Sequence, residues 1–210
     1  MSANYVAREL GFRMNGWGEG DRAANEAFAP LESFAERVDA VLTQIASRMG
    51  VRVFTTVSTK EKAELSREAG AAEVILYAEQ DFEAEVKRLT GGKGVDVVYD
   101  SVGKTTFDGS LNCLRPRGML ALFGASSGPV PPFDLIQLSS KGSLYVTRPT
   151  LWHYIATRQE LELRAGEVLG AVASGELKLR MEHVYPLADA GRAQADMESR
   201  KTTGKILLEP

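Results

Sequence analysis

The sequence predicts an α/β fold: a Rossmann-like parallel sheet with helices on both of its faces. Short, almost continuously apolar runs alternate with helical patterns from residue 51 onward, and such runs are typical of parallel strands buried on both faces. Turn residues such as Gly70 separate these runs. The chain has 210 residues, of which 44% are hydrophobic, and this is enough for one core of ordinary size.

The predicted strands and helices follow one another in alternation. β-branched and apolar runs predict strands at 51–57, 73–77, 95–99, 119–123 and 143–147. Helical patterns cover residues 60–69, 81–89, 105–114 and 151–173, the last with room for one break. Parallel strands joined in this way need right-handed crossover connections.

The two ends of the chain differ from this pattern. Residues 1–40 form an atypical segment that we predict to be helical at 23–28 and again from 31 into 49, with 5–14 undecided between helix and strand. Residues 178–210 read as a short α+β tail with an extended run, a helix at 188–199 and a strand at 205–208. The predicted units are therefore an N-terminal segment (1–40), a Rossmann-like cofactor domain (41–177) and a C-terminal tail (178–210).

Composition and charge argue against several classes of function. The net charge is −3, whereas a nucleic-acid partner requires clustered Lys and Arg. Cys113 is the only cysteine, so no internal disulfide can form, which fits a reducing compartment. No run of about 18 apolar residues and no secretory start are present. We expect a cytoplasmic protein with no membrane partner.

The first candidate site follows the strand at 51–57. Domains specific for NAD place an acidic residue at this strand end, where it binds the ribose hydroxyls. Here the end carries Ser58 and Thr59, with Lys62 in the first turn of a helix. Hydroxyls, a cation and helix amides suit the 2′-phosphate of NADP. The alternative is an ordinary Ser/Thr helix cap beside solvated lysines.

Small residues follow two further strands. Asp100-Ser101-Val102-Gly103 follows the strand at 95–99, and Gly124-Ala125-Ser126-Ser127-Gly128 follows the strand at 119–123. Ligands of open α/β sheets bind beyond the carboxyl ends of strands, where small residues allow close approach. Turn formation explains the same residues without a ligand.

Other polar residues form no recognisable catalytic or metal site. His153 and His183 lack the neighbouring ligands that zinc requires. Cys113 stands in a helix expected to pack on the sheet, where thiols are inert. Asp100 has no nucleophile and base around it. We therefore assign no metal and no catalytic residue.

Several segments together resemble one known family. They are residues 97–103, 114–118, 123–128, 141–149 and the ending 200–208. The chain from 41 to 210 resembles the zeta-crystallin-type NADPH:quinone oxidoreductases, a zinc-independent branch of the medium-chain dehydrogenase/reductase superfamily.

The resemblance implies NADP(H) as cofactor, quinones or related enones as substrates, and a homodimer formed through the edge strand near Ser143–Thr147. It implies that Ser58 and Lys62 hold the 2′-phosphate and that Tyr77 lies against the adenosine. The remaining residues implied to line the cofactor groove are Ser101, Val102, Gly124, Ala125, Ser126, Ser127, Thr147, Arg148, Pro149, Leu151 and Arg200. The protein's task in such an enzyme is chiefly to position the hydride donor.

The resemblance ends before residue 41. The family's N-terminal catalytic domain, first Rossmann strand and glycine-rich phosphate loop are not matched. Phe34–Asp39 aligns with that loop, and Glu36 and Asp39 place negative charge where phosphate should lie. We therefore expect a truncated form whose sheet lacks its central strand. Residues 5–14 or nearby sequence could fill the gap, the neighbouring strands could pair directly, or the sheet could split. An inactive chain acting as a dimerisation or interaction module is the alternative function.

Overall fold

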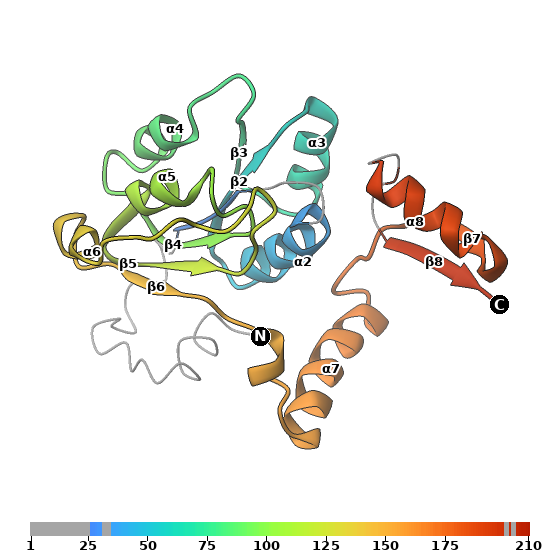
Figure 1. Cartoon of the computed structure of the whole chain (residues 1–210). Helices are drawn as coiled ribbons and strands as arrows, with labels where there is room; N and C mark the ends of the chain where they lie inside the picture. Colours follow the sequence, from blue (N-terminus) through green and yellow to red (C-terminus); the bar gives the residue numbers. More distant parts are fainter. Residues whose placement is uncertain (1–25, 31–34, 200–201, 203–204) are drawn as a thin grey trace.

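The structure, a computed structural model, describes residues 26–30, 35–199, 202 and 205–210 (Figure 1). It contains a six-stranded, wholly parallel sheet in the order β3-β2-β1-β4-β5-β6. The strands are β1 (Glu26–Pro30), β2 (Arg52–Val57), β3 (Glu73–Leu76), β4 (Val95–Asp100), β5 (Leu114–Leu122) and β6 (Tyr145–Thr147). The predicted α/β fold with a Rossmann-like parallel sheet is confirmed.

The prediction that the central strand is missing is wrong. β1 pairs with β2 on one side and with β4 on the other, so residues 26–30 fill the central position. The helix predicted at 23–28 is also wrong, because residues 26–28 belong to the strand β1. Pairing on both edges outweighs the low strand preference of Glu and Ala in this short run, and Pro30 lies beyond Phe28, the last residue of β1 that pairs with β4. The stretch 5–14, which could also have filled the gap, lies outside the described residues.

Helices cover both faces of the sheet (Figure 1). α2 (Ala35–Arg48) and α3 (Lys60–Glu68) pack against each other and β2, whereas α4 (Phe82–Leu89) and α5 (Phe107–Asn112) lie together elsewhere on the sheet. The main core joins the α4 and α5 side chains to the sheet, and a smaller cluster lies under α3. Completely buried side chains at the centre of the main core are Phe54, Val86, Val95, Val98 and Leu120.

Some element boundaries differ from the predicted ones. β5 begins at Leu114 rather than 119, whereas α2 is described from Ala35 and its predicted start at 31 lies outside the described residues. A short helix, α6 (Ile136–Ser140), was not predicted. The predicted break in 151–173 is confirmed, because a 3₁₀ turn, η1 (Leu151–His153), precedes α7 (Arg158–Ala173).

The C-terminal residues form a separate small unit beyond α7 (Figure 1). β7 (Met181–Pro186) and β8 (Lys205–Glu209) pair in parallel, joined through a 3₁₀ turn (Leu187–Asp189) and α8 (Ala190–Glu198). The prediction of an α+β tail is confirmed, but the domain boundaries at 40 and 177 stay a prediction, and β1 shows that the sheet draws on residues before 41.

The linker before this unit is bound to α2. The side-chain amide of Gln44 donates to the carbonyl of Lys178 at 3.1 Å, and its oxygen accepts from the Lys178 amide at 2.9 Å. One turn later, Arg48 forms an ion pair with Glu176 at 2.9 Å. These contacts fix the direction in which the chain leaves α7.

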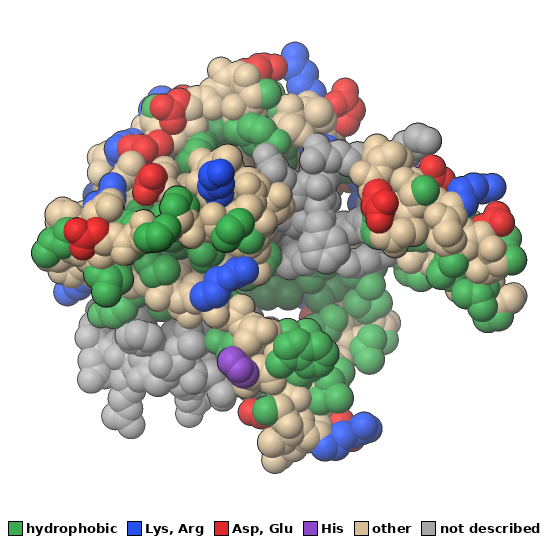
Figure 2. Space-filling view, viewed as in Figure 1, with side chains coloured by type: hydrophobic (Ala, Val, Ile, Leu, Met, Phe, Trp, Pro, Cys, Tyr) green, Lys and Arg blue, Asp and Glu red, His purple; other side chains and the backbone are tan. Residues whose placement is uncertain are grey.

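Hydrophobic side chains gather at the surface around η1 and α7 (Figure 2). Trp152 is 73% exposed, and Leu151 is 63% exposed. No helix among the described residues is long and apolar enough to cross a membrane.

Candidate functional site

The carboxyl ends of the central strands lie along one edge of the sheet. The register places one row of residues across it: Phe54 beside Phe28, Phe28 beside Val98, Val98 beside Leu120, and Leu120 beside Val146. Four positions after each member come the predicted tip residues of β2, β4 and β5, namely Ser58, Val102 and Gly124. The predicted tips therefore share one edge.

The strand order fixes where a ligand would bind along this edge. The chain moves from β1 outward to β3, then returns to β4 on the other side of β1. Open α/β sheets bind nucleotides at this reversal point. Ser58 and Gly124 flank it, three strand spacings or about 14 Å apart.

At the end of β2, capping the helix and contacting a ligand fall to two different residues. Thr59 is the N-cap of α3, because its hydroxyl accepts the amide of Lys62 at 3.3 Å. Ser58 is half-buried, and its hydroxyl bonds to no part of the chain that the structure describes. Ser58 can therefore serve a ligand without uncapping the helix. The half-buried Lys62 stands in the first turn, as predicted.

An acidic residue shares this turn. The pKa of Glu61 is lowered by its own backbone amide and by the Thr59 hydroxyl. The side chain is fully exposed and remains ionised at neutral pH. The Glu61 carboxylate lies at the N-terminus of α3. It repels a bound phosphate only weakly, because exposed charges are screened by solvent.

Tyr77 lies immediately beside the tip of β2. It follows β3, is half-buried, and donates its amide to the carbonyl of Val57 at 3.1 Å. The structure therefore brings Tyr77 and Ser58 to neighbouring strand ends.

Asp100 organises the loop after β4. Its side chain is completely buried. One carboxylate oxygen accepts the amides of Val102 at 2.8 Å and Gly103 at 3.0 Å, and the other accepts the hydroxyls of Thr106 and Ser110, both at 2.8 Å. These four bonds give Asp100 a structural role in the loop, which the sequence alone did not reveal.

The loop after β5 packs directly on the loop after β4. Ser126 donates its amide to the carbonyl of Ser101 at 3.2 Å, and Ser127 donates its amide to the carbonyl of Val102 at 2.9 Å. A Cβ on Gly124 would lie 2.6 Å from the Cα of Ser101. The small residues at these tips are thus required by contact between the two loops, in addition to any ligand.

Within this pair of loops, exposure differs among the predicted residues. Ser101 and Val102 are buried, and Gly124 and Ser127 are half-buried. Ala125 and Ser126 are exposed. Only the outer residues therefore offer side chains to a ligand, and the inner ones offer backbone.

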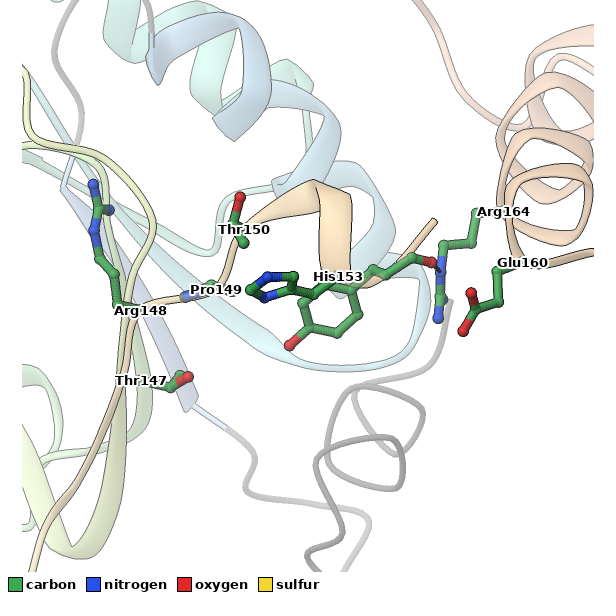
Figure 3. Close-up of a pocket in the computed structure, with 8 residues that line it drawn as sticks. Thr147, Arg148, Pro149, Thr150, His153, Glu160 and Arg164 are labelled. Carbon is green, nitrogen blue, oxygen red and sulfur yellow. Dashed lines mark hydrogen bonds between the residues drawn. The ribbon is translucent and has the colours of Figure 1, made fainter. Parts of the chain in front are cut away.

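The end of β6 borders a pocket of about 340 Å³ (Figure 3). Arg164 is 9% exposed, donates from Nε to the Tyr154 carbonyl at 2.5 Å and stacks over the Tyr154 ring. Hydrogen bonds from the backbone and hydroxyl of Thr157 lower the pKa of Glu160, so this side of the pocket holds a carboxylate together with the Arg164 cation. The complete lining is Thr147, Arg148, Pro149, Thr150, His153, Tyr154, Glu160 and Arg164.

The pocket joins some predicted residues and leaves others out. Thr147, Arg148 and Pro149 line it. Leu151 is exposed in η1 and does not line it, and Arg200 lies outside the described residues. Tyr154, Glu160 and Arg164 were not foreseen. The Thr157-x-x-Glu160 capping pattern in the sequence marked the start of α7 and could have located this wall.

No metal site or reactive thiol is evident in the described part of the chain. It holds no group of three or more His, Cys, Asp or Glu side chains able to bind a metal ion. Burial raises the pKa of Cys113, so this thiol is protonated and unreactive.

Residues 40–160 match the model of a family described as zinc-binding dehydrogenases. The chain belongs to this family. It is 46% identical over 175 residues to quinone oxidoreductase 1 of Escherichia coli, with 82% of this chain and 54% of that protein covered. It is 44% identical over 171 residues to a 2-haloacrylate reductase of a Burkholderia species, with coverages of 81% and 51%. The predicted resemblance to quinone oxidoreductases is confirmed.

A solved structure supports the same relationship. A mycobacterial protein in complex with NADPH is 46% identical and superimposes with a TM-score of 0.80, over 98% of this chain and 61% of that one. The chain spans about half the length of the enzymes named above. The family's description refers to zinc binding, and that this chain functions without zinc stays a prediction.

Proposed function

We propose that this chain binds NADP(H) across the ends of β2, β1, β4 and β5 and forms the cofactor-binding part of an enzyme that reduces quinones or related enones. The observation that carries the proposal is the end of β2, where the Ser58 hydroxyl has no partner among the described residues while Thr59 caps the helix. A homologue binds NADPH. When bound, the cofactor would supply the hydride.

Each end of the groove has its own role in this proposal. Ser58 and Lys62 hold the 2′-phosphate at the start of α3, where helix amides also favour an anion. Tyr77 lies against the adenosine. The loops 101–102 and 124–127 provide the floor of the groove, and Thr147, Pro149 and Leu151 border the reacting end. Arg200, which lies outside the described residues, would contact the cofactor from the tail.

The connection between β1 and α2 is the weakest part of the fit. No glycine occurs from residue 26 to residue 49, although a glycine normally lets backbone approach the pyrophosphate here. Residues 35–39, most of the stretch aligned with the phosphate loop, belong to the helix α2. We therefore expect weaker binding of the pyrophosphate than of the 2′-phosphate end.

Titration of tryptophan fluorescence with NADPH and NADH tests the proposal. The unaltered chain should bind NADPH more tightly than NADH, and Ser58→Ala and Lys62→Met should each weaken NADPH binding by about tenfold, the effect of losing one contact. Binding of NADH should be unchanged. Lys93→Met, an exposed lysine in the turn before β4, is the matched control. Equal affinity for both cofactors, or none for NADPH, would contradict the proposal.

A second candidate function is a dimerisation module. β6 is the last strand of the described sheet, and its Tyr145 and Val146 are 43% and 38% exposed. Such an edge can pair with a copy of itself about a two-fold axis, and we propose a homodimer through Ser143–Thr147. Light scattering should show a dimer that Val146→Lys converts to monomer. A monomeric unaltered chain would contradict it. Cytoplasmic location is part of the same proposal.

A further inference from the structure

Arg148 uses its side chain to bind the main chain of the neighbouring strand. Its Nη1 donates to the carbonyl of Leu122 at 2.8 Å and to the carbonyl of Gly124 at 3.1 Å. Figure 3 shows the guanidinium turned away from His153 and Glu160, so Arg148 contributes little to the interior of the pocket that it borders.

The reason for this contact lies in the end of β6. Thr147 is the last residue of the strand and pairs with Ala121. Pro149 follows two positions later and has no amide hydrogen to donate, so the ladder between β5 and β6 cannot continue. The guanidinium supplies N–H donors to carbonyls that lie beyond the end of the ladder.

Through Gly124 this contact reaches the loops of two other strands. The Gly124 amide donates to the carbonyl of Asp100 at 3.3 Å, and Ser126 and Ser127 donate to the carbonyls of Ser101 and Val102. The side chain that follows β6 therefore holds the β5 loop, and this loop in turn packs on the β4 loop.

We propose that Arg148 is a positioning residue that fixes the Gly124–Ser127 loop in the conformation that receives the cofactor. The inference rests on the proposed function, and it revises the role predicted for Arg148 from the family resemblance. Of the five N–H donors of the guanidinium, both on Nη1 are engaged by the carbonyls of Leu122 and Gly124, and the contact with the loop is therefore the one that the structure shows for this side chain.

Amide hydrogen exchange on the full chain without cofactor tests the positioning role by itself. Arg148→Met keeps the aliphatic stem and removes the donors. The amides of Gly124, Ser126 and Ser127 should then exchange about tenfold faster, as the loss of one ordinary hydrogen bond gives. Arg158→Met is the matched control, because Arg158 is an exposed arginine of α7 whose guanidinium forms an ion pair with Glu162, far from the loop.

Two ligands then separate positioning from direct contact. Arg148→Met should weaken NADPH binding by about tenfold. Binding of adenosine 2′-phosphate should be unaffected, because that fragment needs only the tip of β2, about 14 Å from Gly124. Arg148→Lys should restore NADPH affinity only in part, since an ammonium cannot reproduce the reach and planar geometry of a guanidinium.

Each outcome decides the inference. Unchanged exchange of the loop amides in Arg148→Met overturns it, whether or not the chain binds NADPH. Full restoration by Arg148→Lys, with exchange unaltered and a strong salt dependence, would show a direct charge contact instead. Failure of the unaltered chain to bind NADPH would refute the proposed function, while faster exchange in the variant would still support the bracing of the loop by Arg148.

Discussion

Replacement of Gly124 by alanine tests the close packing of the β4 and β5 loops. The added Cβ would collide with the carbonyl oxygen of Ser101 and would lie 2.6 Å from both the Cα and the carbonyl carbon of the same residue, whereas ordinary contact begins at 3.4 Å. The two backbones must therefore separate by at least about 0.8 Å. Because both partners are main chain, no rotation of a side chain can relieve the collision.

The cost follows from the bonds that this separation stretches. The amides of Gly124 and Ser126 reach the carbonyls of Asp100 and Ser101 at 3.3 and 3.2 Å, so neither bond survives such a shift. Two lost hydrogen bonds at about 1 kcal/mol each, with strain of about 1–3 kcal/mol from overpacking, predict a decrease of about 3–5 kcal/mol in the free energy of unfolding. Urea denaturation measures it.

Gly166→Ala is the matched control. Gly166 stands inside α7, has no neighbour within 4 Å of an added Cβ, and is not in a left-handed conformation. Alanine should stabilise this helix by about 0.5–1 kcal/mol, opposite in sign to its effect at Gly124. Equal stability of Gly124→Ala and the unaltered chain would refute the reasoning, since the loops would then not be in contact.

Three further predictions concern other parts of the chain. Thr157→Ala removes the capping box with Glu160 and should destabilise the start of α7 by about 1 kcal/mol, visible as faster exchange of its first-turn amides. Gln44→Ala should expose the Lys178 amide, so that its exchange accelerates and small-angle scattering reports a wider range of tail positions. Burial raises the pKa of Cys113, so iodoacetamide should react only after unfolding. Because the unfolded thiol ionises first, stability should be constant below about pH 8.5 and decline above it, and Cys113→Ala should lack that decline.

The elements that the sequence predicted correctly are those whose pattern is local. β2 and β4 are short runs of buried residues such as Phe54 and Val98, and their composition identifies strands without reference to their partners. The start of α3 was predicted from Thr59 and its neighbours, and the break before α7 was also foreseen. Each of these signals lies within one turn or strand of the residues that it explains.

The elements that were missed depend on distant partners. Glu26–Pro30 has an ordinary helical composition, and it becomes a strand because β2 and β4 offer hydrogen bonds on both sides. β5 extends back to Leu114 through Arg117, whose φ is 62°. A non-glycine residue in that conformation ordinarily indicates a turn, but here its amide bonds to the Gly142 carbonyl at 2.7 Å. Such pairings arise only in the assembled sheet.

The candidate site shows the same division. Ser58, Ser101 and Gly124 could be chosen from the sequence because each follows a recognisable strand, and the register then places them along one edge. The role of each residue at that edge could not be predicted from the sequence. Thr59 caps the helix, so Ser58 remains available to a ligand. Both carboxylate oxygens of Asp100 accept hydrogen bonds from the residues that follow it, Val102 and Thr106 among them. A strand end therefore identifies where a nucleotide can bind, and the hydrogen-bond partners identify which side chains remain to bind it.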